Sequence, residues 1–498
     1  MNGRKFLTRV RLKPLLVLGV ALPLAAGQLA GCARNPATGG SVFTGGLSQA
    51  EEIQMGRENH PKILQEFNGA YAYRDLDRYV DGIGQRLARI SERNDLKFTF
   101  TVLNSDIVNA FATPGGYIYV SRGLLALADN EAQLAGVLAH EIGHITALHH
   151  AQRQGDALLA NIGVLAAGVL GGRAAAQAGQ LGAVSLLQSF SRENEYEADL
   201  LGVRYLARTG YDPGAMAAFL AKLRAESRLT MIRRGESPDK VDEFNYLATH
   251  PAPAARVDRA AGLAREAAVA TPKTGREEYL SRIDGMLYGD DPSQGFLLGR
   301  DFVHPALRFG FEVPRGFSLF NTSDAVLAIG PDKARIVFDR ADKPFTGSME
   351  AYLRSAWAPG RRLGAVETIR VNGMEAATAT TTAQTPDGTF DARLVAYRFD
   401  AENVYRFVFL TPRAMTAALA LDLRRTTYSF RRLSVAEAAR LKPLVLRIVT
   451  VRPGDTVESL SQRMAFDDYR LERFEVLNGL SRNDRLTPGQ TVKIVAAN

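Results

Sequence analysis

Two histidines and a glutamate stand close together in the segment His140-Glu141-Ile142-Gly143-His144. On a helix, residues four positions apart lie one above the other, so both imidazoles can bind one metal ion. Glu141 lies about 100° further round the helix, where its carboxylate reaches a water beside the metal but is poorly placed as a ligand. Zinc lowers the pKa of such a water to about 7, and Glu141 can take its proton during attack on a peptide carbonyl. The segment therefore predicts hydrolytic zinc chemistry.

Two further histidines are candidates for the third protein ligand that a catalytic zinc needs. His149 and His150 follow on a helical pattern that begins near Asn130. If that helix continues, His150 lies about 15 Å from His140 along the axis and cannot share one ion. His149 is no better placed. A turn out of the helix would favour glycine, but Ala147 stands at that position.

An acidic helical segment about fifty residues downstream offers a better third ligand. It runs from Ser191 to Asp199 with the sequence SRENEYEAD. Glu195 and Asp199 are four residues apart and share a face, whereas Glu197 points nearly opposite. One face thus supplies a ligand carboxylate, Glu195, and a second carboxylate, Asp199, able to accept the outer N–H of a ligand histidine. The alternative is a solvated acidic face paired with Arg192.

The segment before the zinc motif suggests where a substrate binds. A Pro-Gly-Gly turn leads into an alternating run of tyrosine and aliphatic residues. We expect an edge strand beside the cleft, to which an extended substrate adds through main-chain hydrogen bonds. The residues concerned are Gly116, Tyr117, Ile118 and Tyr119. The alternative is an ordinary core strand.

The first 32 residues have the pattern of an export signal. Basic residues up to Lys13 precede seventeen uncharged residues from Pro14 to Ala30, and the only cysteine, Cys32, follows closely. The last four residues of this stretch resemble a bacterial lipobox, in which the cysteine becomes the lipidated first residue. An uncleaved membrane anchor is the alternative, but the run is short for a span of ~20 residues. Residues 1–31 are therefore predicted as a lipoprotein signal peptide and 32–46 as a tether.

Composition limits the kinds of protein that this chain can be. The chain has 498 residues, 46% hydrophobic and 23% charged, so several packed domains are expected. The net charge of +8 includes five bases in the first 31 residues; without them it is +3, which argues against a nucleic-acid partner. A single cysteine excludes a disulfide framework and cysteine-rich metal sites.

Periodicity predicts an α+β arrangement of domains. Residues 47–270 are mainly helical with a small sheet, whose strands are expected in KFTFTVLNS and GGYIYVS. Within them, 157–191 is rich in Ala, Gly and Leu and predicts helices over the active site, with a membrane-dipping hairpin as the alternative. Residues 279–440 are predicted as a strand-rich α+β domain of unknown role. Residues 448–496 have the pattern strand, helix, helix, strand.

Four segments together resemble one peptidase family: HEIGH, SRENEYEAD, the preceding NAFATPGGYIYVSRGLL, and THP at residues 249–251. Over residues 47–265 the chain resembles the gluzincin-type zinc metallopeptidases of the HtpX, CAAX-prenyl-endopeptidase and BepA group, with their mainly helical zincin fold. The resemblance implies one Zn²⁺ per chain, with Glu141 as general base. The implied ligands and their supporting acid are His140, His144, Glu195 and Asp199.

The same resemblance places His250 close to the zinc. Peptide hydrolysis needs a donor aimed at the developing oxyanion, and His250 can supply one. The alternative is a helix-capping or buried structural histidine. The chain lacks the multi-span membrane helices of the first two groups and so resembles the exported, periplasmic members.

The C-terminal segment resembles a LysM module. Residues 449–495 contain V-x-P-G-D-T, L-N-G-L and L-x-P-G-Q at the expected places. Such modules bind the N-acetylglucosamine-containing glycans of peptidoglycan or chitin. The implied contact residues are Gly454, Asp455, Thr456 and Asn478. The alternative is a structural role, because few aromatic residues are available to stack on sugars.

Together these features predict an outer-membrane lipoprotein facing the periplasm. By resemblance to other lipoproteins, Ala33 after the cysteine favours the outer membrane. The expected activity of the protein is that of a zinc endopeptidase in protein quality control, acting on unfolded or misassembled envelope proteins, with peptidoglycan as a further partner. Two alternatives remain. One is a peptidoglycan-associated scaffold, and the other is a zinc peptidase that cuts cell-wall peptides.

Overall fold

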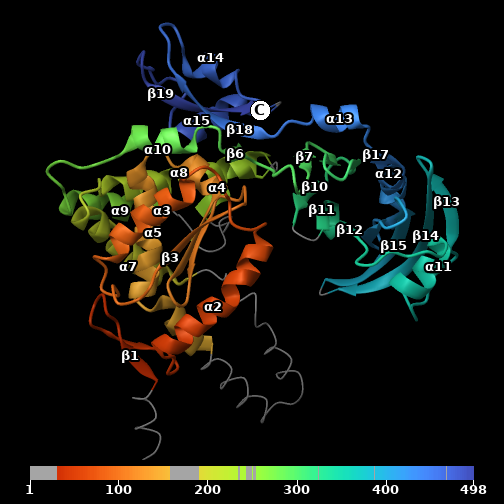
Figure 1. Cartoon of the computed structure of the whole chain (residues 1–498), viewed down its shortest axis with the longest axis horizontal. Coiled ribbons are helices and arrows are strands. Elements are labelled where there is room, and N and C mark those ends of the chain that lie inside the picture. The colour runs from red at the N-terminus through yellow and green to blue at the C-terminus, as the bar shows by residue number, and fades with distance from the viewer. Residues whose placement is uncertain are drawn as a thin grey trace, which may run out of the picture.

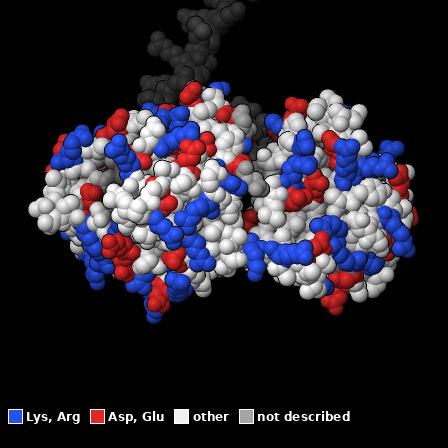
Figure 2. Space-filling model, turned by 90° about the horizontal axis from the view of Figure 1, so that it is seen from above, with Lys and Arg blue, Asp and Glu red and all other residues white. Residues whose placement is uncertain are grey.

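The computed structural model describes residues 31–157, 190–233, 236–242, 250, 254–322, 325–385, 387–466 and 468–498. The predicted signal up to residue 30 and most of the alanine-rich segment lie outside them. The described residues form two bodies with a waist between them (Figures 1 and 2). Basic and acidic side chains are interspersed over the face in Figure 2. None of the described helices is long and apolar enough to cross a membrane.

The first body has the expected mixture of helices and a small sheet. Its N-terminal elements are β1 (Cys32–Arg34), β2 (Ser41–Phe43), α2 (Gln49–Glu66) and α3 (Leu76–Ala88). Helix α2 begins with a capping box, in which Ser48 and Glu51 each accept the other's backbone N–H. Helix α3 buries Val80, Ile83 and Leu87 on one face, in the spacing of an amphipathic helix.

The small sheet corrects the expected substrate strand. Its order is β3-β5-β4, with β3 (Thr99–Leu103), β5 (Tyr117–Ser121) and β4 (Ala110–Thr113). β5 pairs with both neighbours, parallel to β3 and antiparallel to β4. The prediction of an edge strand at Gly116, Tyr117, Ile118 and Tyr119 is therefore wrong. Ile118 and Tyr119 are fully buried, and an apolar run of this kind fits a middle strand as well as an edge.

The outer strand on this side of the sheet is β4. Ser121 donates its N–H to the carbonyl of Asn109, so these two residues form a hydrogen-bonded pair of the antiparallel ladder. Such pairs alternate along the strands. The N–H and C=O groups of Ala110 and Ala112 therefore point away from β5, toward the open edge.

A layer of helices carries the zinc motif. It consists of α4 (Arg122–Leu127), α5 (Glu131–Thr146), α7 (Arg192–Arg208), α8 (Gly214–Arg233), α9 (Ala254–Glu266) and α10 (Arg276–Ile283), with a short 3-10 helix at Pro238–Asp242. Helix α5 is buried along its whole length and packs on α7. Glycines allow the close approach: a Cβ on Gly143 would lie 3.2 Å from the carbonyl oxygen of Ala198, and one on Gly202 would lie 3.3 Å from the backbone nitrogen of His140. The two motif-bearing helices are thereby brought face to face.

The second body contains two sheets, as its strand-rich composition predicted. The four-stranded sheet has the order β17-β9-β8-β7, with β7 (Phe296–Leu298), β8 (Asp301–His304), β9 (Phe309–Glu312) and β17 (Arg431–Arg432). The seven-stranded sheet contains β10 (Ser318–Asn321), β11 (Ala325–Ile329), β12 (Arg335–Arg340), β16 (Val404–Pro412), β15 (Gly388–Arg398), β14 (Met374–Thr385) and β13 (Glu367–Val371), in that spatial order. The accompanying helices are α11 (Met349–Ala351), α12 (Thr416–Ser429) and α13 (Val435–Arg440). Phenylalanines fill the core of this body.

The C-terminal module has the predicted order β18 (Leu444–Thr450), α14 (Val457–Ser461), α15 (Arg470–Asn478) and β19 (Thr491–Ala497). A short strand, β6 (Leu287–Tyr288), adds to the open side of β18. The module belongs to the first body, because Leu446, Phe474 and Val495 share one hydrophobic cluster with α5. Helix α10 also packs there, with Tyr279 fully buried, although the sequence assigned residues from 279 onward to the strand-rich region.

A buried ionic cluster joins the module to the start of α5. Lys493 of β19 donates to the carbonyl oxygens of residues 126–128 at 2.8–2.9 Å and lies 3.0 Å from Asp129. Lys222 of α8 pairs with Asp129 at 2.6 Å and donates to the carbonyl of Leu477 in α15 at 2.9 Å. Burial raises the pKa of Asp129, but the two lysines outweigh it and lower the pKa to about 2. Asp129 thus stays ionised, and the cluster ties α15 and β19 to the turn that leads into α5.

Candidate active site

The end of α5 departs from the sequence prediction. The helix stops at Thr146, and Leu148 adopts a left-handed conformation with φ 63°. Helical structure resumes over residues 149–157. Left-handed leucine is uncommon, so neither periodicity nor a search for glycine could locate this turn. The turn brings His149 back against His144 and buries His150.

The structure brings the three expected ligand side chains together. The Nε2 atoms of His140 and His144 lie 3.0 Å apart. Oε2 of Glu195 lies 3.5 Å from Nε2 of His140, and Oε1 lies 3.5 Å from Nε2 of His144. All three side chains are buried. The four-residue spacing on α5 and the position of Glu195 on α7 produce this convergence.

These separations fit a zinc ion. Ligand atoms about 2.0–2.1 Å from a tetrahedral zinc lie about 3.3 Å from one another, which agrees with the observed 3.0–3.5 Å. His250 belongs to the same group. One ligand atom from each of His140, His144, Glu195 and His250 lies within 4.8 Å of the others. The donor set of nitrogens and a carboxylate is also the set that zinc prefers.

The electrostatics of the site favours a cation. Burial raises the pKa of Glu195, but the charges of His250 and Arg256 outweigh it and hold the pKa well below its usual range. Burial lowers the pKa of His144 well below its usual value. A carboxylate and a neutral imidazole are the protonation states that metal ligands need. Burial also lowers the pKa of His140, but hydrogen bonds to neighbouring carboxylates raise it to about 10, which shows how strongly the site attracts positive charge.

Glu141 lies beside the metal-ligand side chains but is not one of the ligands. Its Oε1 lies 3.4 Å from Nε2 of His250. Its Oε2 is buried and accepts no hydrogen bond from the residues that the structure describes. A buried carboxylate oxygen of this kind suits a group that takes a proton from a bound molecule. His250 itself reaches further in, with Nδ1 2.9 Å from Oε1 of Glu195 and 3.2 Å from Nε2 of His140.

Asp199 lies behind His140, as its spacing from Glu195 predicted. Its Oδ1 is 3.0 Å from Nδ1 of His140, an arrangement that fixes the orientation of a ligand histidine. Arg256 of α9 holds both acids: it donates to Asp199 at 2.7 and 2.8 Å and lies 2.6 Å from Oε2 of Glu195. Arg256 was not predicted from the sequence. Its only signal was its place six residues after His250.

A second set of contacts holds His144. Nδ1 of His149 lies 2.8 Å from Nδ1 of His144, and Nε2 of His149 lies 3.0 Å from Oε2 of Glu197. Asn35 donates to the other oxygen of Glu197 at 3.0 Å, and Phe190 stacks on the ring of His144. Glu197, which the helical spacing placed on the opposite face, therefore supports the site through His149.

A cleft next to His140 and Glu141 is lined by α8 and by the residues that lead into β4. Phe219 and Leu223 come from α8, and Val108 and Ala110 come from the strand side. An extended chain lying on the outer edge of β4 would therefore pass the zinc motif. The outer strand beside the motif is thus β4 and not β5.

The residues predicted to bind glycan fall into two groups. Gly454, Asp455 and Thr456 precede α14 in an exposed or half-exposed loop, and Thr456 caps the helix. Asn478, at the end of α15, is buried. Its side chain bonds to the backbone of Phe474 and Lys493, so it holds the fold of the module together. Cys32 is exposed at the start of β1.

Comparison with known proteins agrees with this geometry. Residues 75–264 match the model of Peptidase family M48, and residues 449–495 match that of the LysM domain. The beta-barrel assembly-enhancing protease of Escherichia coli strain K12 is 34% identical over 251 residues, which are 47% of this chain and 48% of that protein. The protein of the same name from Yersinia pestis is 36% identical, over 44% of this chain and 45% of its own length.

A mitochondrial relative is also similar. The mitochondrial metalloendopeptidase OMA1 of Schizosaccharomyces pombe is 30% identical over 181 residues, 35% of this chain and 52% of that protein. The chain spans about half the length of the curated relatives it matches. Residues 75–264 therefore resemble a peptidase domain of family M48, and residues 449–495 resemble a LysM domain.

Proposed function

We propose that this chain is a zinc-dependent endopeptidase that hydrolyses peptide bonds of unfolded or misassembled envelope proteins. The observation that carries the proposal is the convergence of His140, His144 and Glu195, with Glu141 beside them. The similarity to proteases named for β-barrel assembly supports the substrate class.

Each side chain has a distinct task in this reaction. Zinc held by the two histidines and Glu195 would supply a Lewis acid for the peptide carbonyl and activate a water. Glu141 takes the proton of the attacking water and passes it to the leaving amine. Asp199 and His149 keep the ligand histidines oriented. His250 donates to the developing oxyanion, after its ring turns from the position 2.9 Å from Glu195.

Strand β4 offers the substrate a place to bind. The backbone groups of Ala110 and Ala112 face the open edge, and Ala110 lines the cleft beside the motif. Binding by strand addition uses the backbone of the substrate, so sequence preference is weak. A site of this kind accepts unfolded chains of many sequences.

We also propose the envelope as the location of the reaction. The lone Cys32 is exposed, which leaves it accessible to a lipid anchor in the outer membrane on the periplasmic side. The loop of Gly454, Asp455 and Thr456 is the part of the module open to peptidoglycan. The mass of the mature protein in membrane fractions tests the anchor, and sedimentation of the full chain with purified peptidoglycan tests the glycan contact.

The Glu141→Gln variant tests the activity. The amide cannot take a proton, so casein cleavage is expected to fall at least a hundredfold, while one zinc per chain remains bound because Glu141 is not a ligand. Zinc content and casein cleavage are measured on wild type and variant prepared side by side. Unchanged cleavage in the variant would contradict the proposal. Release of muropeptides from purified cell wall, without casein cleavage, would instead favour a cell-wall peptidase.

A further inference from the structure

The segment between the lone cysteine and the first long helix is folded against the peptidase helices. β1 and β2 pair antiparallel and form the N-terminal hairpin, residues 32–43. This hairpin packs on the helical residues that follow Leu148, where a Cβ on Gly155 would lie 2.7 Å from the carbonyl oxygen of Phe43. A segment predicted as a tether thus has a fixed place beside the helical residues that begin with His149.

Asn35 lies in the turn of the N-terminal hairpin and is only 3% exposed. Its Oδ1 accepts the backbone N–H groups of Ala37 and Thr38 at 2.9 and 3.3 Å. Its amide nitrogen donates to Oε1 of Glu197 at 3.0 Å. Exchanging the oxygen and nitrogen would place a donor against two donors and an acceptor against a carboxylate, so the side chain has one favourable orientation.

Glu197 continues this line of contacts to a zinc ligand. Its Oε2 lies 3.0 Å from Nε2 of His149, and Nδ1 of His149 lies 2.8 Å from Nδ1 of His144. A histidine that binds zinc through Nε2 has its proton on Nδ1. His144 therefore donates to His149, and His149 donates to Glu197 from Nε2. The carboxylate then accepts at both oxygens, from His149 and from Asn35.

Most of this hydrogen-bonded chain is shielded from water. His144, His149 and Asn35 are buried, whereas the side chain of Glu197 is 26% exposed. Hydrogen bonds in such surroundings are stronger than in water and hold their members in one geometry. Water reaches these four side chains mainly at Glu197. Loss of the Asn35 donor is therefore expected to weaken the site several-fold and not to abolish it.

We propose that Asn35 is a positioning residue for zinc. Through Glu197 and His149 it holds the ring of His144 in the orientation that binds the ion, so the N-terminal hairpin is part of the metal site. Cys32 lies only three residues before Asn35, a span of at most about 11 Å. This inference rests on the proposed function and adds that the end of the chain proposed to carry the lipid also completes the zinc site.

The Asn35→Asp variant tests the inference by changing one group. The carboxylate keeps an oxygen that accepts from Ala37 and Thr38, but its second oxygen cannot donate to Glu197 and repels it. The affinity of the purified full chain for Zn²⁺ is measured by competition with a chromophoric chelator. The dissociation constant is expected to rise about three- to tenfold, less than the roughly 10–100-fold effect of a residue that contacts a ligand directly.

Adding Glu197→Gln is expected to reverse this result. In the double variant, the amide at position 197 donates to the carboxylate at position 35, and its oxygen still accepts from His149. In the Glu197→Gln background, Asn35→Asp is therefore expected to leave zinc affinity unchanged or to tighten it about twofold. A residue that only stabilises the hairpin would weaken zinc binding by the same factor in both backgrounds.

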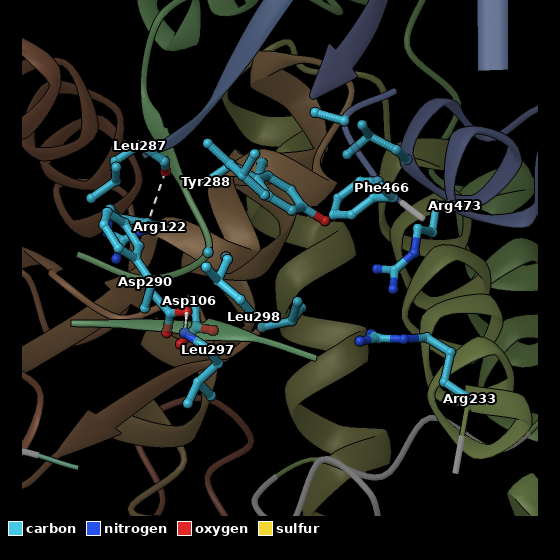
Figure 3. Close-up of a pocket in the computed structure, with 18 of the residues that line it drawn as sticks. Asp106, Arg122, Arg233, Leu287, Tyr288, Asp290, Leu297, Leu298, Phe466 and Arg473 are labelled. Carbon is cyan, nitrogen blue, oxygen red and sulfur yellow. Dashed lines mark hydrogen bonds between the residues drawn. The ribbon is translucent and has the colours of Figure 1, made fainter. Parts of the chain in front are cut away.

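Asn104→Asp is the matched control. The amide of Asn104 also donates to a carboxylate, that of Asp291, and its oxygen accepts from Arg122 at 2.8 Å. These contacts lead toward the strand-rich body, because Arg122 donates to the carbonyl of Leu287 at 3.1 Å and lines a cavity of about 800 Å³ there (Figure 3). The control loses the same kind of hydrogen bond and is expected to keep its zinc affinity within about twofold of wild type. Thermal unfolding midpoints of the metal-free variants show how far each change affects overall stability.

Three outcomes overturn the inference. The first is an unchanged zinc affinity in Asn35→Asp. The second is an equal loss with glutamate and with glutamine at position 197. The third is a loss as large in the Asn104→Asp control, which would show that zinc binding follows overall stability.

Casein cleavage separates this inference from the proposed function. Cleavage by zinc-loaded wild type, together with an unchanged zinc affinity in Asn35→Asp, overturns only the role of Asn35. If wild type binds zinc but cleaves no casein, the peptidase function is contradicted, and the zinc affinities of the variants still decide the role of Asn35.

Discussion

Three of the four acids of α7 lie at three different distances from the metal position. Glu195 is among the ligand atoms, 3.5 Å from Nε2 of both histidines of the motif. Of the two motif histidines, Asp199 contacts only His140, at its outer nitrogen. Glu197 reaches the site through His149 and is the most exposed of the three. Similar charges on one helix are therefore expected to differ sharply in their effect on zinc.

Zinc binding by three single variants checks this order. Glu195→Gln replaces an anionic ligand with a neutral amide and is expected to lose most of the zinc. Asp199→Asn leaves the ligands in place and should weaken zinc affinity about 10–100-fold. Glu197→Gln should weaken it less, because an amide oxygen can still accept from His149. Zinc stoichiometry is measured at saturating and at limiting metal. Equal zinc in all three variants would contradict the ligand assignment and return His149 to contention.

Residue spacing was enough to predict the centre of the site but not its surroundings. His140, His144, Glu195 and Asp199 depend only on helical periodicity, which holds within α5 and α7. The contact of Arg256 with Glu195 and Asp199 depends instead on how α9 packs against α7. No local sequence pattern predicts such packing. The role of His149 depends on the left-handed Leu148, where local preference and the observed backbone disagree.

The strands show the same division at the scale of elements. The two alternating segments of the peptidase region predicted β3 and β5 close to their observed ranges. Alternation could not say that β5 is central, because order in a sheet is set by pairing between distant segments. In the strand-rich body, the small alanines and threonines of β14 give only a weak strand pattern. The outer strand on this side of the sheet is consequently β4, one strand away from the predicted edge.

Ala110→Pro tests β4 as the substrate edge. Proline removes an N–H that faces the open edge, and edge strands tolerate it because the ladder to β5 is not used at that position. One lost backbone hydrogen bond is expected to raise KM about fivefold, with kcat little changed. Casein kinetics are measured on samples matched for zinc content and thermal stability. An unchanged KM at equal stability would exclude this edge from substrate binding.

At the scale of the whole molecule, the hydrophobic cores divide the chain at other places than its sequence composition suggests. The LysM segment looks like a separate module in sequence, yet its apolar residues join the core around α5 and its Lys493 is fully buried there. The strand-rich body has hydrophobic clusters of its own. Short motifs reveal a module but not the partner that it packs against, and a buried lysine in a strand looks like a surface residue until its acceptors are known.

Excising residues 296–441 tests whether the strand-rich body folds apart from the rest. Leu444 pairs with Tyr288 across β18 and β6, so the two ends of the excised segment are close, and a short glycine-serine linker can join them. Because the core around α5 keeps all of its members, the shortened chain is expected to bind one zinc and cleave casein. The thermal unfolding midpoint of the first body should stay within about 5 °C of its value in the full chain.

Removing residues 444–498 instead is the matched comparison for this excision. That deletion takes Leu446, Phe474 and Val495 out of the shared core and leaves Asp129 without Lys493. Exposing so much apolar surface should lower the unfolding midpoint far more and reduce bound zinc, because Asp129 lies directly before the cap of α5. Zinc content and thermal unfolding followed by circular dichroism are measured for both deletions and for the full chain. If the excision lowers the midpoint as much as the C-terminal deletion does, the two bodies share their stability and the separate hydrophobic clusters do not mark independent units.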